Sequence, residues 1–140
     1  MKFLKLRMIA GFIIAFTIIF ELPAHANDEN QMTKLTFSKS VQVPGRILPA
    51  GTYQFMLAKN DSNRNIVEIF NADGTALYAT IQTISAERGR KAYRTSVTLA
   101  QRPNGQPEAL VTWFYPGNDI GHEFVYSKQV ESELAKAANN

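Results

Sequence analysis

The chain has 140 residues, of which 45% are hydrophobic and 19% charged, a balance typical of one globular domain. Fifteen lysines and arginines against twelve aspartates and glutamates give a formal net charge of +3, which does not indicate a nucleic-acid-binding protein. The absence of cysteine excludes a disulfide framework, a thiol nucleophile, a thiolate metal site and a lipid-modified N-terminal cysteine.

Residues 1–26 have the three-part pattern of a cleavable export signal. A basic start ending at Arg7 leads into the apolar run 8–20, and Ala24-His25-Ala26 provides small residues for cleavage. This run is shorter than the roughly 20 residues of a membrane-spanning helix. We therefore expect cleavage after Ala26, no transmembrane anchor afterwards, and a bacterial protein that is periplasmic or extracellular.

Cleavage would change the charge and the histidine content of the product. It removes three of the fifteen basic residues and Glu21, which leaves 12 basic and 11 acidic side chains. Because His25 is removed as well, His122 becomes the one imidazole of the remaining chain. A zinc site built from several histidines is thereby excluded.

Residues 27–32 are polar and without pattern, and we expect them to be a flexible lead-in. Residues 33–127 show short apolar alternations separated by Gly, Pro and Asn, which predicts an all-β domain. The fold expected is an antiparallel β-sandwich or small barrel of about seven to eight strands, and the periodicity does not choose between the two. The predicted strands lie around Leu35–Phe37, Val41–Val43, Tyr53–Leu57, Ile66–Phe70, Thr75–Ile84, Tyr93–Leu99, Leu110–Tyr115 and Gly121–Tyr126.

Turn signals connect these strands. The stretch 44–51 is read as turns, Asp73-Gly74 as the tip of a tight hairpin, and 102–107 as a second turn with two prolines. Apolar spacings near four in residues 128–140 predict a short C-terminal helix from about Lys128 to Ala138, followed by a tail. The core candidates are Tyr53, Phe55, Leu57, Ile66, Ile69, Leu77, Ile81, Val97, Leu99, Val111 and Phe124.

The sequence contains none of the common catalytic or phosphate-binding motifs, so we predict no catalytic residue and no cofactor. Asp119, His122 and Glu123 are close in sequence but lack the helical spacing of zinc motifs, so no metal site is predicted either. Carboxylates at Glu68 and Glu108, together with Asp119 and Glu123, leave open a glycoside-hydrolase pair.

Two groups of side chains are candidates for ligand contact. Trp113 and Tyr115 share one face of a strand, and Tyr126 lies on what we expect to be a neighbouring strand. Exposed rings would suit stacking on sugars or binding of a protein partner, whereas coverage of both strand faces would bury them. Arg88 and Arg90, in a loop with further basic residues, form a positive patch that could attract anionic glycans.

Four segments of the chain resemble a family of uncharacterised exported bacterial proteins. They are 37–53 (FSKSVQVPGRILPAGTY), 64–75 (RNIVEIFNADGT), 113–117 (WFYPG) and 123–126 (EFVY). The resemblance implies export and a β-rich fold, and it implies no activity, cofactor or partner. The chain departs from the family at Ala100-Gln101, where members often have an acidic pair, and at Ser127, where they often have proline.

These observations favour an exported, non-catalytic domain that binds an envelope glycan or a protein partner. The expected contacts are Trp113, Tyr115, Tyr126, His122, Arg88 and Arg90. Two alternatives stay open: a small polysaccharide-acting hydrolase that uses carboxylates or His122, and a β-barrel carrier of a small apolar ligand.

Overall fold

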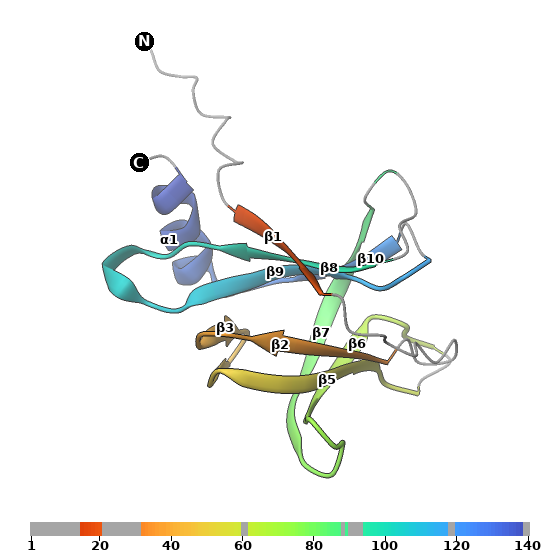
Figure 1. The fold of residues 1–140 in the computed structure, drawn as a ribbon. Helices are drawn as coiled ribbons and strands as arrows, with labels where there is room; N and C mark the ends of the chain where they lie inside the picture. Colours follow the sequence, from red (N-terminus) through yellow and green to blue (C-terminus); the bar gives the residue numbers. More distant parts are fainter. Residues whose placement is uncertain are drawn as a thin grey trace.

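The structure is a computed structural model, which describes residues 15–20, 32–59, 62–87, 89, 94–117 and 120–138 (Figure 1). The strands are β1 (Ala15–Phe20), β2 (Thr33–Phe37), β3 (Val41–Val43), β4 (Arg46–Leu48), β5 (Gly51–Leu57), β6 (Ile66–Asn71), β7 (Leu77–Glu87), β8 (Thr95–Ala100), β9 (Glu108–Phe114) and β10 (Ile120–Phe124). A short 3₁₀ turn spans Pro103–Gly105, and the helix α1 spans Lys128–Ala138.

The predicted all-β fold with a short C-terminal helix is confirmed. The described residues form ten strands, where the sequence predicts seven to eight. One addition is β4, which lies in the stretch read as turns and pairs with β3 around Pro44-Gly45. Gly45 has a φ of 82°, the left-handed conformation that such a two-residue hairpin turn requires. The other is β1, which lies within the predicted export signal.

The strands form one continuous path with the order β1-β8-β9-β10-β7-β6-β5-β2. The long strand β7 belongs to both halves of this path, because residues 77–82 pair with β6 and residues 83–87 pair with β10. It runs from the layer of β2, β5 and β6 into the layer of β8, β9 and β10 in Figure 1. Within the described ranges no pairing joins the ends of the path, so the sheet does not close on itself.

The hairpin β3–β4 makes the sheet mixed. β3 pairs in parallel with the start of β9, with Val41 opposite Glu108 and Gln42 opposite Ala109. β10 pairs with the later part of the same edge of β9, where His122 lies opposite Trp113. Strands from the beginning and from the end of the domain therefore meet on β9.

The core lies between the two layers. It is made by inward-facing side chains of both, namely Leu35, Phe37, Val41, Val43, Leu48, Tyr53, Phe55, Leu57, Val67, Ile69, Ile81, Val97, Leu99, Ala109, Leu110, Trp113, Tyr115, Phe124 and Tyr126. Burial of a large apolar side chain stabilises a fold by about 1.5 to 3 kcal/mol relative to exposure, so this cluster is the main source of stability.

Three of the core candidates lie elsewhere. Ile66 and Val111 are half-buried, and Leu77 is 50% exposed. Val111 is the extra residue of an irregularity in which Thr98 and Leu99 pair with Thr112 and Leu110. Leu77 precedes a similar irregularity, where Ile69 and Phe70 pair with Ala79 and Leu77. Such bulges break the two-residue alternation on which the predictions for Leu77 and Val111 depend.

Helix α1 lies at the same end of the molecule as the turn between β8 and β9 (Figure 1). Val130 and Leu134 pack against the core. Arg102, in the β8–β9 turn, forms a 3.0 Å ion pair with Glu133 and fixes the helix to the sheet. Within the portion of the chain that the structure describes, no helix has the length and apolar character needed to cross a membrane.

Candidate ligand-binding pocket

The aromatic residues expected to contact a ligand are part of the core. Trp113 is 0% exposed, Tyr115 7% and Tyr126 9%. Phe114, on the opposite face of β9, is buried as well. Both faces of this segment are therefore covered, and these rings do not form an exposed stacking surface.

Trp113 instead lies at the centre of a buried aromatic cluster. Its ring makes edge contacts with Phe55 at 5.6 Å and Tyr115 at 5.3 Å between centroids, and it stacks on His122 at 5.6 Å. Edge and offset-stacked pairs stabilise by about 0.5 to 1.5 kcal/mol beyond the area they bury. The cluster thus holds the two layers together.

The hydrogen bonds of His122 identify its neutral tautomer. The Thr83 hydroxyl donates its single proton to the Asn65 carbonyl oxygen at 2.7 Å, so it must accept from His122 Nδ1 at 3.0 Å. His122 Nε2 then carries a lone pair, and it has no hydrogen-bond partner among the described residues. Burial, and secondarily the Arg64 cation, lower the pKa of His122 to about 4.

This environment does not suit catalysis by His122. The side chain is 3% exposed, so a substrate cannot reach its ring without a rearrangement of the core. Tyr126 is equally structural, because its hydroxyl donates to the Leu110 carbonyl at 2.6 Å and lies 3.0 Å from the Gln42 carbonyl. Burial raises the pKa of Tyr126, which keeps the phenol protonated.

The remaining predicted residues are distributed over the molecule. Arg88, Arg90 and Asp119 lie outside the described residues. Glu68 is half-buried on β6 and Glu108 is half-buried at the start of β9. Over the described ranges, no three His, Cys, Asp or Glu side chains gather in a way that could hold a metal ion.

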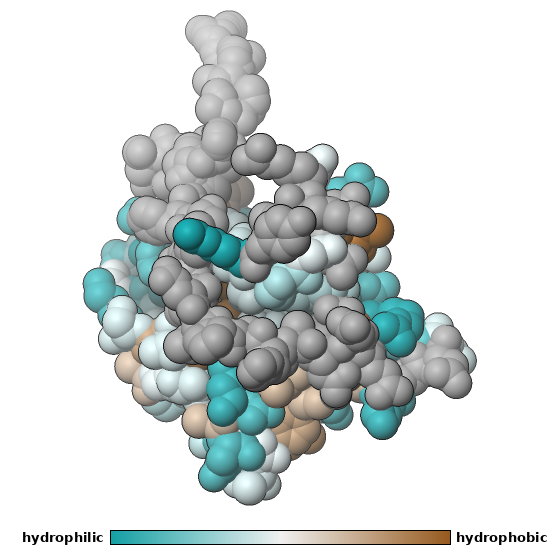
Figure 2. Space-filling model, turned by 45° about the vertical axis from the view of Figure 1, so that its right-hand side comes forward, coloured by the Kyte–Doolittle hydropathy of each residue, from teal (hydrophilic) through white to brown (hydrophobic). Residues whose placement is uncertain are grey.

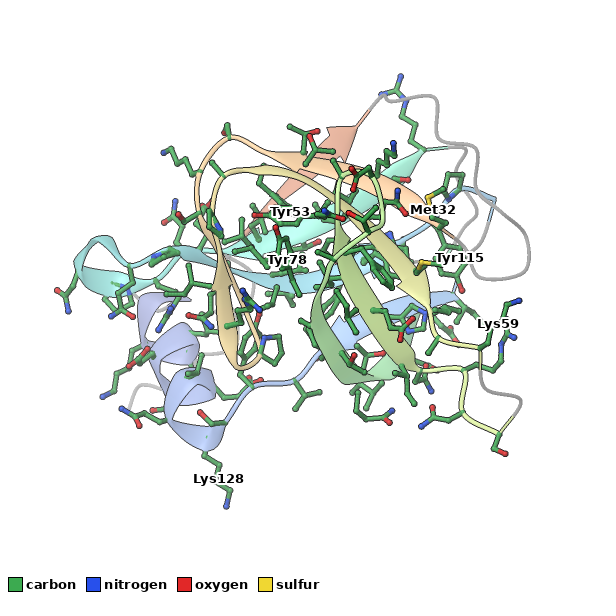
Figure 3. All side chains as sticks on the ribbon, turned by 90° about the horizontal axis from the view of Figure 1, so that it is seen from below. Met32, Tyr53, Lys59, Tyr78, Tyr115 and Lys128 are labelled. Carbon is green, nitrogen blue, oxygen red and sulfur yellow. The ribbon has the colours of Figure 1, made fainter. Side chains whose placement is uncertain are left out.

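A pocket of about 380 Å³ opens elsewhere, beside the β4–β5 turn. It is lined by Arg46, Leu48, Pro49, Ala50, Gly51, Thr52, Tyr53 and Tyr78. A volume above 300 Å³ falls in the range of small-molecule sites. Tyr53 and Tyr78 lie close together in Figure 3, and their ring centroids are 5.7 Å apart in an edge arrangement.

The bulge in β7 gives the pocket its shape. Tyr78 is the residue skipped between the pairs Ile69–Ala79 and Phe70–Leu77. A bulge redirects the side chain of the extra residue, and here it brings the Tyr78 ring against Tyr53. On the other wall, the Tyr53 hydroxyl donates to the Pro49 carbonyl and holds the turn in place.

Arg46 provides the charge of the pocket. Its Nη1 donates to the Tyr78 carbonyl oxygen at 2.7 Å, and its guanidinium carbon lies 5.0 Å from the centroid of the Tyr78 ring. These contacts fix the position of the guanidinium group and leave most of its five N–H donors for other acceptors. Burial, and secondarily the neighbouring Tyr78, raise the pKa of Tyr53, which keeps the Tyr53 phenol protonated.

The chemistry of the lining residues favours binding. Arg46 is the one charged side chain among them, and they include no His, Cys, Asp, Glu or Lys that could act as base or nucleophile. A fixed guanidinium group between apolar and aromatic walls suits an anionic group on a ring-shaped ligand.

Sequence reasoning missed this pocket. Residues 44–51 were read as turns, and the bulge that turns Tyr78 inward has no signal in the alternation of apolar residues. The segment 37–53 did stand out, but only through a resemblance that implies no site.

A second pocket, of about 460 Å³, lies between β2 and the end of β8. Thr36 and Phe37 line one side, and Leu99 and Gln101 line the other. On the face shown in Figure 2, hydrophilic residues are interspersed with a few apolar ones.

No family model, no curated protein and no solved structure matches this chain. The resemblance to exported bacterial proteins therefore stays a prediction from the sequence.

Proposed function

We propose that this chain is an exported, non-catalytic domain that binds an acidic glycan of the bacterial envelope. The observation that carries the proposal is the position of Arg46 in the pocket beside the β4–β5 turn. A uronic-acid carboxylate would pair with the free donors of the guanidinium group, and the sugar ring would pack on Pro49 and the half-buried Tyr78 ring.

The argument for an acidic rather than a neutral ligand is electrostatic. Arg46 is the single charged group of the lining and faces no carboxylate within it, so an anion can pair with it without displacing an internal partner. Arg46 is exposed, and an exposed charge pair contributes about 0.2 to 1 kcal/mol. The expected contribution of Arg46 is therefore up to roughly fivefold in affinity.

The test is a titration of the ¹⁵N-labelled chain with an oligogalacturonate, followed by NMR. We expect chemical-shift changes at Arg46, at residues 49–53 and at Tyr78, and weaker changes with a neutral oligosaccharide of the same length. Arg46→Gln should lower the affinity for the acidic oligosaccharide by up to roughly fivefold and leave that for the neutral one unchanged. Arg94→Gln is the matched control, because Arg94 is exposed at the start of β8 and does not line the pocket.

Equal binding of the acidic and neutral oligosaccharides would contradict the proposal, as would unchanged affinity in Arg46→Gln. Tyr78→Leu tests the contribution of the aromatic ring separately from that of Arg46. It removes the ring beneath the guanidinium group and keeps an apolar side chain. We expect it to weaken binding of the acidic oligosaccharide while the chain stays folded.

A further inference from the structure

Strand β8 is paired on both sides in the structure. One side pairs with β9, and the other carries β1 in an antiparallel register of six residue pairs, from Ala15 opposite Ala100 to Phe20 opposite Thr95. Because β1 ends the sheet, β8 becomes the edge strand wherever residues 15–20 are absent. These residues lie within the predicted export signal.

The sequence of β8 lacks the devices that protect an edge strand. Thr95–Ala100 reads TSVTLA, with no charged residue and no proline. Natural edge strands are usually defended by lysine, proline or other charged residues, which prevent pairing with a further strand. The opposite end of the sheet has such a defence, because β2 carries the exposed Lys34 and is followed by the exposed Lys39.

The segment on β8 indicates what this edge accepts. Residues 15–20 read AFTIIF, an uncharged segment with large apolar residues. In the register of the pair, Phe16 lies opposite Leu99 and Ile18 lies opposite Val97. On β8 itself the alternate residues Val97 and Leu99 are buried in the core. The occupant therefore needs apolar residues at alternate positions.

The space beside this edge extends beyond the pairing. The 460 Å³ pocket between β2 and β8 begins at Leu99 and Gln101 and is bounded by Thr36 and Phe37 of β2. An added strand on β8 would thus run toward an open volume between the two ends of the sheet.

We propose that the edge of β8 is an acceptor site for an extended segment of a partner protein, added to the sheet as an antiparallel strand. The segment is uncharged over about six residues and carries large apolar side chains at alternate positions, because backbone pairing supplies affinity and alternate side chains supply specificity. The site is separate from the pocket at Arg46. Its use in the exported protein depends on removal of residues 15–20.

The experiment uses the full chain with the substitution Ile18→Pro. Proline cannot donate an N–H to the ladder and fixes φ at about −65°, away from the φ of about −140° of antiparallel strands, so it disfavours the pairing of β1. The probe is a peptide of residues 15–20 with two lysines at each end, and its matched control has proline in place of Ile18. Amide hydrogen exchange of Thr95–Ala100 is measured by mass spectrometry.

We expect slow exchange in β8 of the wild-type chain, faster exchange in Ile18→Pro, and recovery when the probe peptide is added. The proline peptide should not restore protection. Equal recovery with both peptides, or no recovery with either, would overturn the proposal. Protection that returns with chain concentration alone would overturn it in favour of a second copy of this chain.

A disulfide cross-link provides an independent test of strand pairing if Ile18→Pro does not fold. The natural chain has no cysteine, so Thr17→Cys with Thr98→Cys creates one defined pair at directly opposed positions. We expect this pair to oxidise to an intramolecular disulfide, and Thr17→Cys with Ser96→Cys, two residues out of register, to do so far less. Failure of the first pair, or equal yields from both, would show that β8 does not accept this strand.

Discussion

His122 shows how burial sets the protonation of a single residue. Its Nδ1–H donates to Thr83, its Nε2 has no described partner, and its pKa is lowered to about 4 from an ordinary value of 6.5. From the sequence, His122 is the one imidazole that would remain after the predicted cleavage. The sequence could not show that the ring stacks on Trp113 in the core, because that contact depends on the pairing of β9 with β10.

The lowered pKa predicts a pH-dependent stability. Between pH 6.5 and about 4 the unfolded chain gains a proton at His122 that the folded chain does not accept. The free energy of unfolding therefore falls as pH drops through this window, by at most about 3 kcal/mol from this residue. Urea denaturation at a series of pH values should show a shallower dependence for His122→Gln than for the wild-type chain.

Protonation of carboxylates changes the free energy of unfolding of the wild-type chain and of His122→Gln alike in this pH range. The contribution of His122 is therefore the difference between the two pH curves. Parallel curves would contradict a neutral, buried His122.

At the level of the strands, the alternation of apolar residues predicts burial correctly in regular strands and fails in strands that contain a bulge. The alternation in β5 correctly placed Tyr53, Phe55 and Leu57 in the core. The same reasoning failed at Leu77 and Val111, because one extra residue in a strand reverses the face of those beyond it. The candidate pocket was missed for the same reason, since it depends on the bulge at Tyr78.

The pairing of β9 with β10 predicts an unusual sensitivity at Gly121. A Cβ atom there would lie 2.4 Å from the Trp113 carbonyl oxygen and 2.6 Å from the Phe114 ring. We expect Gly121→Ala to lower the free energy of unfolding by about 2 to 3 kcal/mol, the upper part of the range for overpacking. Urea denaturation followed by circular dichroism measures the change.

Gly105→Ala is the control for this substitution. Gly105 has a φ of 71° and open space around it, so alanine there costs conformational strain of about 1 kcal/mol without a clash. Equal losses at the two positions would show that β9 and β10 adapt to the added methyl group.

For the molecule as a unit, the two layers are joined by β7 and by the aromatic cluster around Trp113. Phe55 lies on β5 in one layer, and Trp113 lies on β9 in the other. Tyr115 directly follows β9, and both rings contact Trp113. The sequence indicated that the two faces of 113–115 differ, but alternation alone does not say what covers each face. The buried position of these rings follows from the packing of one layer on the other.

Removal of the Trp113 ring should destabilise the domain as one cooperative unit. We expect Trp113→Ala to lower the free energy of unfolding by about 3 to 5 kcal/mol, as for other large aromatic residues in cores. Val125→Ala, at a side chain that is 45% exposed, should change it little. Thermal unfolding followed by far-ultraviolet circular dichroism distinguishes the two. A Trp113→Ala chain as stable as the wild type would contradict the core assignment.

The parallel pair of β3 with β9 has a kinetic consequence. It joins Val41 and Gln42 to Glu108 and Ala109, positions far apart in the chain, and the Tyr126 hydroxyl ties the same two strands together. Closing so long a loop costs chain entropy before any contact is gained, and folds dominated by such pairings form slowly. Strand β3 cannot complete its pairing until β9 has been synthesised, whereas β2 and β4 pair with strands near them in the sequence. A newly made chain therefore lacks this parallel pair, and the hydroxyl tie of Tyr126, until synthesis has passed β9 and reached residue 126.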